Sequence, residues 1–97
     1  MPEALNDTEL EQALARLEHW RLDDGALRRD VRFANFVEAF AFLSAVALLA
    51  ERHGHHPEIE NVYRNVTLRL RTHDAGNRVS QMDVDLALAI DTHAGEH

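Results

Sequence analysis

The sequence contains no cysteine and no lysine, and serine is almost as scarce. Without cysteine there can be no disulfide, no thiolate nucleophile and no cysteine-ligated zinc or iron–sulfur centre. All ten cationic residues are arginine, which excludes a lysine Schiff base and the lysine of a phosphate-binding loop. The two serines, Ser44 and Ser80, lie outside any G-x-S-x-G motif. Several common kinds of catalytic site are therefore excluded.

Long apolar runs and positive charge are also missing. The longest apolar stretch, residues 39–50, has 12 residues, whereas a bilayer span takes about 20, so it predicts a core helix. Ten arginines against seventeen acids give 10 − 17 = −7, which disfavours nucleic acid and anionic membranes as partners. The first 20 residues carry five acids and no basic or apolar region typical of a signal peptide, so we expect a cytoplasmic location.

Length and composition predict one small globular domain. The 97 residues are 45% hydrophobic and 28% charged, which is ordinary for a folded chain. We expect a single domain over residues 1–97, with loose ends at residues 1–7 and 92–97. A domain of this size buries only about two-thirds of the surface that its unfolded chain exposes, so burial against a second subunit would be useful. We therefore expect an oligomer.

The first third of the chain predicts a helix and a hairpin. Thr8 with Glu11 forms a capping-box pattern ahead of leucines at helical spacing. From about residue 18 apolar and polar residues alternate, as in a β-strand, and the D-G turn within residues 23–25 favours a tight hairpin. The second arm, residues 26–33, alternates between an apolar and a charged face.

A central apolar helix follows this hairpin. Asn35 with Glu38 resembles a second capping arrangement, and Gly54 marks a plausible helix end. The apolar residues between them cover too wide an arc for a single contact. The apolar residues outside that single contact indicate either a subunit interface or a deeply buried helix.

The last third of the chain predicts two short strands and a helix. Residues 61–73 alternate, with a turn at Arg64-Asn65, although the alternation would also allow one long strand. Ser80 with Asp83 caps a third helix. The order is therefore α-β-β-α-β-β-α, which fits an α+β fold with a four-stranded antiparallel sheet and helices packed on one face.

Histidine is the most prominent candidate for chemistry. Four of the seven histidines fall at a junction after the central helix and at the end of a strand: His53, His55, His56 and His73. Histidine exchanges protons near neutrality, so residues 51–57 are a natural acid/base centre. Glu51, at the helix end, could orient an imidazole and help to keep it protonated.

Each of these residues also has a plain structural explanation. A histidine-rich turn is often a solvated helix cap, His73 could simply be exposed, and Asp83 suits a capping box. Tyr63 could pack at a strand end. A metal site is disfavoured because no HExxH motif occurs, and His93 with His97 fit a polar tail better than a metal site.

The combination is more specific than its parts. The pattern Glu51-x3-His55-His56-Pro57-x5-Tyr63-x9-His73-x9-Asp83 closely resembles the signature of the pterin-4a-carbinolamine dehydratases. The short segments HHPE, NVY, TLRLRTH and D-x-D-L-A also resemble sequences of that family. The resemblance covers residues 5–91.

The resemblance implies a small α+β protein assembled into dimers or tetramers, without a metal or any other cofactor. It implies dehydration of a 4a-hydroxytetrahydropterin, such as 4a-hydroxytetrahydrobiopterin, to quinonoid dihydropterin. By matching positions it implies three catalytic histidines, His55, His56 and His73. It also implies supporting or substrate-binding roles for Glu51, Pro57, Tyr63 and Asp83.

The chemistry of these residue types suits the implied reaction. Expelling a 4a-hydroxyl requires an acid for the leaving group and a base for the neighbouring nitrogen, and histidines can supply both. Our hypothesis is that His56 or His73 acts as the acid, and that His55, oriented by Glu51, binds substrate or takes the nitrogen proton. Many relatives carry an aromatic residue where this chain has Ile59-Glu60, so substrate preference could differ.

An alternative function is that of a non-catalytic dimerisation or binding module, similar to a transcriptional cofactor, that retains the fold. Such a module would use the apolar surface of residues 36–49 to hold a protein partner. The three histidines favour the enzyme, because a scaffold has no need of imidazoles at those spacings.

Overall fold

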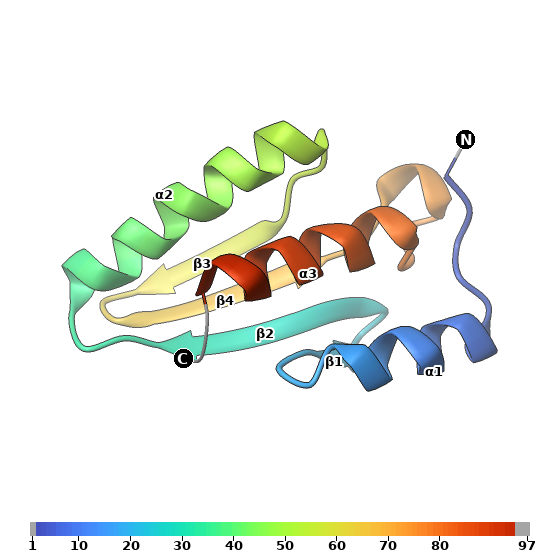
Figure 1. Ribbon diagram of the computed structural model, residues 1–97, viewed down its shortest axis with the longest axis horizontal. Coiled ribbons are helices and arrows are strands. Elements are labelled where there is room, and N and C mark those ends of the chain that lie inside the picture. Colours follow the sequence, from blue (N-terminus) through green and yellow to red (C-terminus); the bar gives the residue numbers. More distant parts are fainter. Residues whose placement is uncertain (1, 95–97) are drawn as a thin grey trace.

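The computed structural model describes residues 2–94, in which three α-helices cover a four-stranded antiparallel sheet (Figure 1). The predicted order α-β-β-α-β-β-α and the α+β class are confirmed. The elements are α1 (Asp7–Arg16), β1 (Arg21–Asp23), β2 (Ala26–Arg32), α2 (Phe36–His53), β3 (Glu58–Val62), β4 (Asn65–Leu70), the 3₁₀ turn η1 (His73–Ala75) and α3 (Gln81–Ala94). No helix within residues 2–94 has the length and apolar character needed to cross a bilayer.

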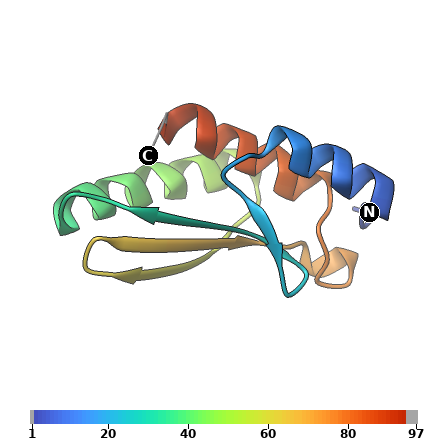
Figure 2. The ribbon, with the colours of Figure 1, turned by 90° about the horizontal axis from the view of Figure 1, so that it is seen from below.

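The sheet has the strand order β1-β2-β4-β3, so β2 and β4 form its centre and β3 is an edge strand. In the central pair, Leu27 lies opposite Leu70 and Val31 lies opposite Val66. Figure 2 shows all three helices on one face of the sheet, with the other face open. This confirms the predicted layer arrangement.

The core lies between the sheet and the helices. Alternation along β2 buries Leu27, Arg29 and Val31 and exposes Asp30 and Arg32, as the sequence predicted. The other apolar groups of the core come from β4, from the three helices and from the segments next to these elements: Val66, Leu68, Leu70, Ala13, Leu17, Trp20, Phe33, Ala39, Phe42, Leu43, Val46, Val79, Val84, Leu86, Ala87 and Ile90.

Helices α1 and α2 both begin at a capping residue, but the predicted cap of α1 was wrong. For α2, the side chain of Asn35 accepts a hydrogen bond from the backbone of Glu38, as predicted. For α1, the capping box is Asn6 with Glu9 instead of Thr8 with Glu11. The same three-residue spacing occurs two positions earlier, and asparagine is among the best N-cap residues, so the helix starts there.

Both predicted hairpins form, but the second is shifted from residues 61–73: β3 begins at Glu58, the turn lies one residue earlier, and β4 ends at Leu70. Asp24 and Gly25 both have positive φ, as a tight two-residue hairpin turn requires. Between β3 and β4, Val62 pairs with Asn65, so the turn is Tyr63-Arg64 and not Arg64-Asn65. The side-chain amide of Asn61 donates to the carbonyl groups of Tyr63 and Asn65, which holds the turn in this register.

The chain ends differ from the prediction of loose segments. Ala4 forms a β-bridge with Ser80, and the backbone N–H of Leu5 donates to the carbonyl of Val79 at 2.9 Å. The bridge satisfies backbone groups that a free leader would leave to water. At the other end, α3 includes residues 92–94. The rest of the predicted C-terminal tail, residues 95–97 with His97, lies outside the described residues.

The wide apolar arc of α2 is divided between the core and the surface. Phe42, Leu43 and Val46 are buried against the sheet and α3. Four large apolar side chains of the same helix are exposed, namely Phe36, Val37 (75% exposed), Phe40 and Leu48 (74% exposed). Of the two interpretations of this arc, a deeply buried helix is therefore wrong for a single chain.

Candidate active site

The position of His55 is set by the end of α2. Gly54 caps the helix in the left-handed conformation, with φ of 60°, and its N–H bonds the carbonyls of Ala50 and Glu51. The backbone N–H of His55 also bonds the carbonyl of Ala50, at 3.1 Å. This cap reverses the chain direction, so that His55 turns inward and is buried while His56 remains exposed.

His55 is paired with a carboxylate from the last helix. Its Nε2 lies 2.5 Å from Oδ1 of Asp83, which is fully buried at 0% exposure. A carboxylate oxygen only accepts, so Nε2 carries the proton in this pair. No residue in the described part of the chain forms a hydrogen bond with Nδ1. The pairing therefore leaves Nδ1 as the ring atom that can exchange a proton.

Asp83 is held by two further donors. Its Oδ2 accepts from the hydroxyl of Thr72 at 2.7 Å and from the backbone N–H of Ser80 at 2.9 Å. The contact with Ser80 is the capping interaction predicted from the sequence, because Ser80 directly precedes α3. Asp83 thus serves both as a helix cap and as the partner of His55. Three donors offset the cost of burying this carboxylate.

His56 is paired with Glu51, which corrects the predicted role of that glutamate. Nε2 of His56 lies 2.5 Å from Oε2 of Glu51, and both side chains are mostly exposed. We expected Glu51 to orient His55. The inward turn of His55 carries its ring away from the exposed face of α2, and His56 takes the place beside Glu51. Adjacent histidines therefore have different carboxylate partners.

His73 begins the η1 turn and lies beside the same network. The residue before it, Thr72, is buried and bonds Asp83, while the His73 ring is exposed and its Nδ1 lies 3.2 Å from Oδ1 of Asn77. The end of α2, the start of β3 and η1 occupy the same end of the sheet (Figure 1). The structure therefore gathers all three predicted catalytic histidines at that end.

The start of β3 joins this end of the sheet through Pro57. Pro57 separates His56 from the edge strand, a position where its missing N–H costs no ladder hydrogen bond. The next residue, Glu58, accepts from Arg71 at 3.0 Å. This ion pair links the start of β3, which follows His56 and Pro57, to the residues between β4 and His73.

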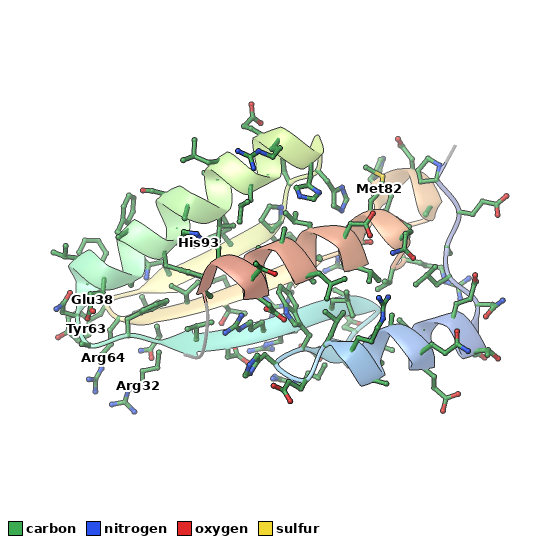
Figure 3. The ribbon with its side chains drawn as sticks, viewed as in Figure 1. Arg32, Glu38, Tyr63, Arg64, Met82 and His93 are labelled. Carbon is green, nitrogen blue, oxygen red and sulfur yellow. The ribbon has the colours of Figure 1, made fainter. Side chains whose placement is uncertain are left out.

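Tyr63 does not join these residues within one chain. It lies in the turn at the other end of the β3–β4 hairpin, where its ring contacts the Arg64 guanidinium. Figure 3 shows Tyr63 with Arg64 and Arg32 at one end of the molecule and Met82, the neighbour of Asp83, at the other. The five residues of β3 separate Tyr63 from the histidines by about 17 Å, given 3.3 Å per residue. Sequence spacing could not reveal this separation.

The described residues contain no cluster of metal-ligating side chains. Among residues 2–94, no three side chains of histidine, aspartate or glutamate converge as metal ligands would. The clear pKa shifts belong to the open face of the sheet. There the hydrogen bond from Arg28 lowers the pKa of Asp23, and Asp23 raises the pKa of Arg28 in turn.

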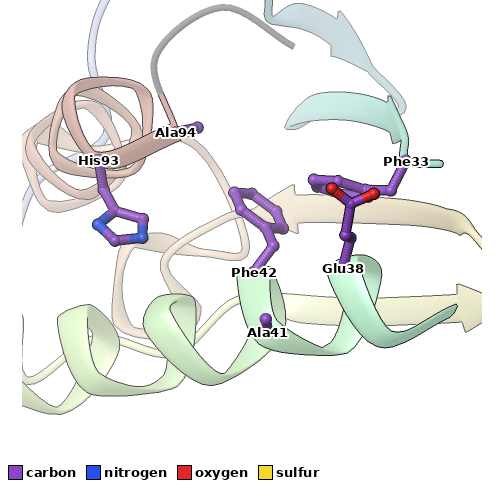
Figure 4. Close-up of a pocket in the computed structure, with 6 residues that line it drawn as sticks. All are labelled: Phe33, Glu38, Ala41, Phe42, His93 and Ala94. Carbon is purple, nitrogen blue, oxygen red and sulfur yellow. The ribbon is translucent and has the colours of Figure 1, made fainter. Parts of the chain in front are cut away.

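A separate hollow lies away from His55, His56 and His73. It has a volume of about 280 Å³ and lies between α2 and the end of α3 (Figure 4). Figure 4 shows Phe42 between His93 on one side and Glu38 with Phe33 on the other. None of the predicted site residues lines it.

Sequence reasoning did not identify Thr72 and Ser80 as members of the site. Their hydroxyl oxygens lie 2.6 Å apart, and both residues are buried. A signal for Thr72 was present, because the buried positions 66, 68 and 70 of β4 extend to position 72. A hydroxyl at a buried position needs a partner. The identity of that partner depends on tertiary packing.

Comparison with known proteins identifies the family to which this sequence is similar. The family model described as pterin 4 alpha carbinolamine dehydratase matches residues 3–93. A protein of Prochlorococcus marinus (strain MIT 9303) is 51% identical over 86 residues, covering 89% of this chain and 88% of the relative. A protein of Rhodopseudomonas palustris (strain HaA2) is 46% identical over 98 residues, covering 99% and 96%. Both relatives are assigned only provisionally as pterin-4-alpha-carbinolamine dehydratases.

Two solved structures are also similar. The transcriptional coactivator/pterin dehydratase from Brucella melitensis has a TM-score of 0.90 at 36% identity, covering 96% of this chain and all of that one. A pterin dehydratase-like protein identified as a RuBisCO assembly factor in the alpha-carboxysome has a TM-score of 0.66 at 27% identity, covering 80% and 92%. By its sequence, its fold and the match over nearly its whole length, this chain belongs to the pterin 4 alpha carbinolamine dehydratase family.

Proposed function

We propose that this protein dehydrates a 4a-hydroxytetrahydropterin, such as 4a-hydroxytetrahydrobiopterin, to the quinonoid dihydropterin in tetrahydropterin recycling. The bond between C4a and the hydroxyl oxygen breaks, the hydroxyl takes a proton and leaves as water, and the neighbouring ring nitrogen loses a proton. The observation that carries this proposal is the pair of adjacent histidines with separate carboxylates, His55 with Asp83 and His56 with Glu51.

The two pairs suit the two proton transfers. His55 has Nε2 committed to Asp83, so its Nδ1 is suited to take the nitrogen proton. His56 has its Nε2 beside Oε2 of Glu51, which orients the ring, so His56 is one candidate for the acid and His73 is the other. Each positioned proton transfer typically contributes about 10²- to 10⁴-fold. These residues could therefore catalyse the reaction without a covalent intermediate.

The proposed active protein is a homodimer or homotetramer. The exposed face of α2, formed by Phe36, Val37, Phe40 and Leu48, supports this assembly, because such residues clustered on one helix usually mark an interaction surface. Contact between copies would bury these side chains and add to the modest core of a domain of this size.

A second candidate is a non-catalytic binding module. The same apolar face of α2 favours it, as does the likeness to a protein identified as a RuBisCO assembly factor. In this alternative the face holds a different protein, and loss of the histidines leaves the function intact. The histidine–carboxylate pairs favour the enzyme, because a binding surface on α2 does not require them.

The test generates the 4a-hydroxytetrahydropterin enzymatically in the presence and absence of the purified protein and follows its decay by absorbance. Mass spectrometry of the products checks for loss of one water. We expect faster decay and the quinonoid product. Folded, oligomeric protein that leaves the decay rate unchanged for pterins with several side chains would refute the dehydratase and favour the binding module.

A further inference from the structure

The hydroxyl groups of Thr72 and Ser80 form a directed hydrogen-bond chain that ends at Asp83. Thr72 donates its single hydroxyl proton to Oδ2 of Asp83 at 2.7 Å. The 2.6 Å contact between the two hydroxyls must then use the proton of Ser80, with Thr72 as acceptor. The backbone N–H of Met82 donates to Oγ of Ser80 at 3.3 Å. All of these bonds point toward the carboxylate.

The members of this chain come from separate parts of the fold. Thr72 follows β4, and its backbone N–H bonds the carbonyl of Arg78 at 2.9 Å. Ser80 precedes α3 and is bridged to Ala4 of the N-terminal segment. Both residues are almost fully buried, so the two hydroxyls have little access to water. Their backbones are fixed on both sides of Asp83, which gives that carboxylate one orientation.

From this geometry we infer that Thr72 and Ser80 are positioning residues for the proposed dehydration. They hold Asp83 so that His55 keeps its proton on Nε2 and presents Nδ1. Thr72 also directly precedes His73, so the same hydroxyl connects the position of the His55 ring to the strand end that carries His73. This role rests on the proposed function for its kinetic consequence, but not for its effect on the His55 ring.

The direct test replaces Thr72 with valine, which keeps the branched shape and removes the hydroxyl. Thr72→Ser keeps the hydroxyl and is the rescue variant. The matched control is Thr67→Val, because Thr67 also donates to an aspartate at 2.7 Å, but on the open face of the sheet. Loss of one hydrogen bond to a charged group typically costs a factor of about 10 to 100. We expect a fall of that order in kcat for Thr72→Val, a small change in KM, near-normal activity for Thr72→Ser, and no change for Thr67→Val.

A second readout separates this inference from the proposed function. The ¹⁵N chemical shifts of His55 report which ring nitrogen carries the proton, whether or not the protein is a dehydratase. We expect a single Nε2-protonated form in the wild type and in Thr72→Ser, and a mixture of tautomers in folded Thr72→Val. Ser80→Ala should give a smaller shift in the same direction, because its backbone donor to Asp83 remains. An unchanged His55 spectrum in folded Thr72→Val would overturn the inference.

Discussion

Nε2 of His55 lies 2.5 Å from Oδ1 of Asp83, although 28 positions separate the two residues in the chain. This contact joins the end of α2 to the start of α3 inside the protein. It also fixes which nitrogen of His55 remains available for proton transfer. Within the proposed site this pair is buried, whereas the neighbouring pair of His56 with Glu51 is exposed. The two pairs should therefore respond differently to substitution.

Replacing Asp83 with asparagine should destabilise the fold. The amide NH₂ would face one of the three donors that now converge on the carboxylate, which leaves a buried group without a partner. We expect a loss of about 1–3 kcal/mol in the free energy of unfolding, measured by urea denaturation. Asp85→Asn is the control, because Asp85 is exposed on the same helix and should change stability by less than about 0.5 kcal/mol. Equal effects of the two substitutions would contradict the account.

Replacing Glu51 with glutamine should affect activity more than stability. The pair of Glu51 with His56 is mostly exposed, and exposed pairs contribute about 0–1 kcal/mol to folding. If Glu51 acts through His56, dehydration should slow in Glu51→Gln, but the same change in a His56→Ala background should have no further effect. Steady-state rates of the four proteins in this cycle measure the coupling. Independent, additive losses would show that Glu51 acts elsewhere.

A charge on the exposed face of α2 should weaken self-association. Val37→Asp and Leu48→Asp each place a carboxylate where we propose that two copies meet. Sedimentation velocity should show smaller species for both variants, while circular dichroism shows that the fold is retained. Ala15→Asp, an exposed helical position on α1, should leave the assembly unchanged. Wild-type assembly in both α2 variants would place the interface on another surface.

The open face of the sheet should lose stability in acid. Burial raises the pKa of Asp30, but hydrogen bonds from Thr67, Arg21 and Arg28 outweigh it and hold the pKa below its usual value. The stabilisation is therefore present above the unfolded-state pKa and disappears as pH falls through the lowered folded-state value. Thermal unfolding of wild type and Asp30→Asn should differ most above the unfolded-state pKa of Asp30 and converge as the pH falls through the lowered folded-state value. A difference that grows in acid would contradict the cited shift.

Local patterns predicted the elements of the fold well. The cap of Asn35 with Glu38, the turn at Gly25 and the alternation in β2 are all found in the structure. Each depends on residues close together in the chain, so sequence alone contains the information. The errors are also local. The cap at Asn6 and the turn at Tyr63 were placed one or two residues away, because neighbouring residues offered similar signals.

Tertiary pairing was the part that sequence could not supply. The alternation along β2 correctly placed Arg29 on the apolar face of that strand. It could not predict the 2.6 Å contact of Arg29 with Asp91 of α3, because Asp91 lies 62 positions away in the chain. In the same way, the family resemblance identified His55, Asp83 and Glu51 as candidates without revealing which carboxylate serves which histidine. That assignment depends on the chain reversal at Gly54 and on how α3 packs beside α2.

The most direct test of the account compares the wild type with His55→Ala/His56→Ala in the decay of enzymatically generated 4a-hydroxytetrahydropterin. Both proteins are used at equal concentration, with circular dichroism and sedimentation confirming the same fold and assembly. The account predicts faster decay with the wild type and none of that acceleration with the double variant. Equal acceleration by both proteins would contradict the assignment of proton transfer to these histidines, and no acceleration by either would contradict the dehydratase itself.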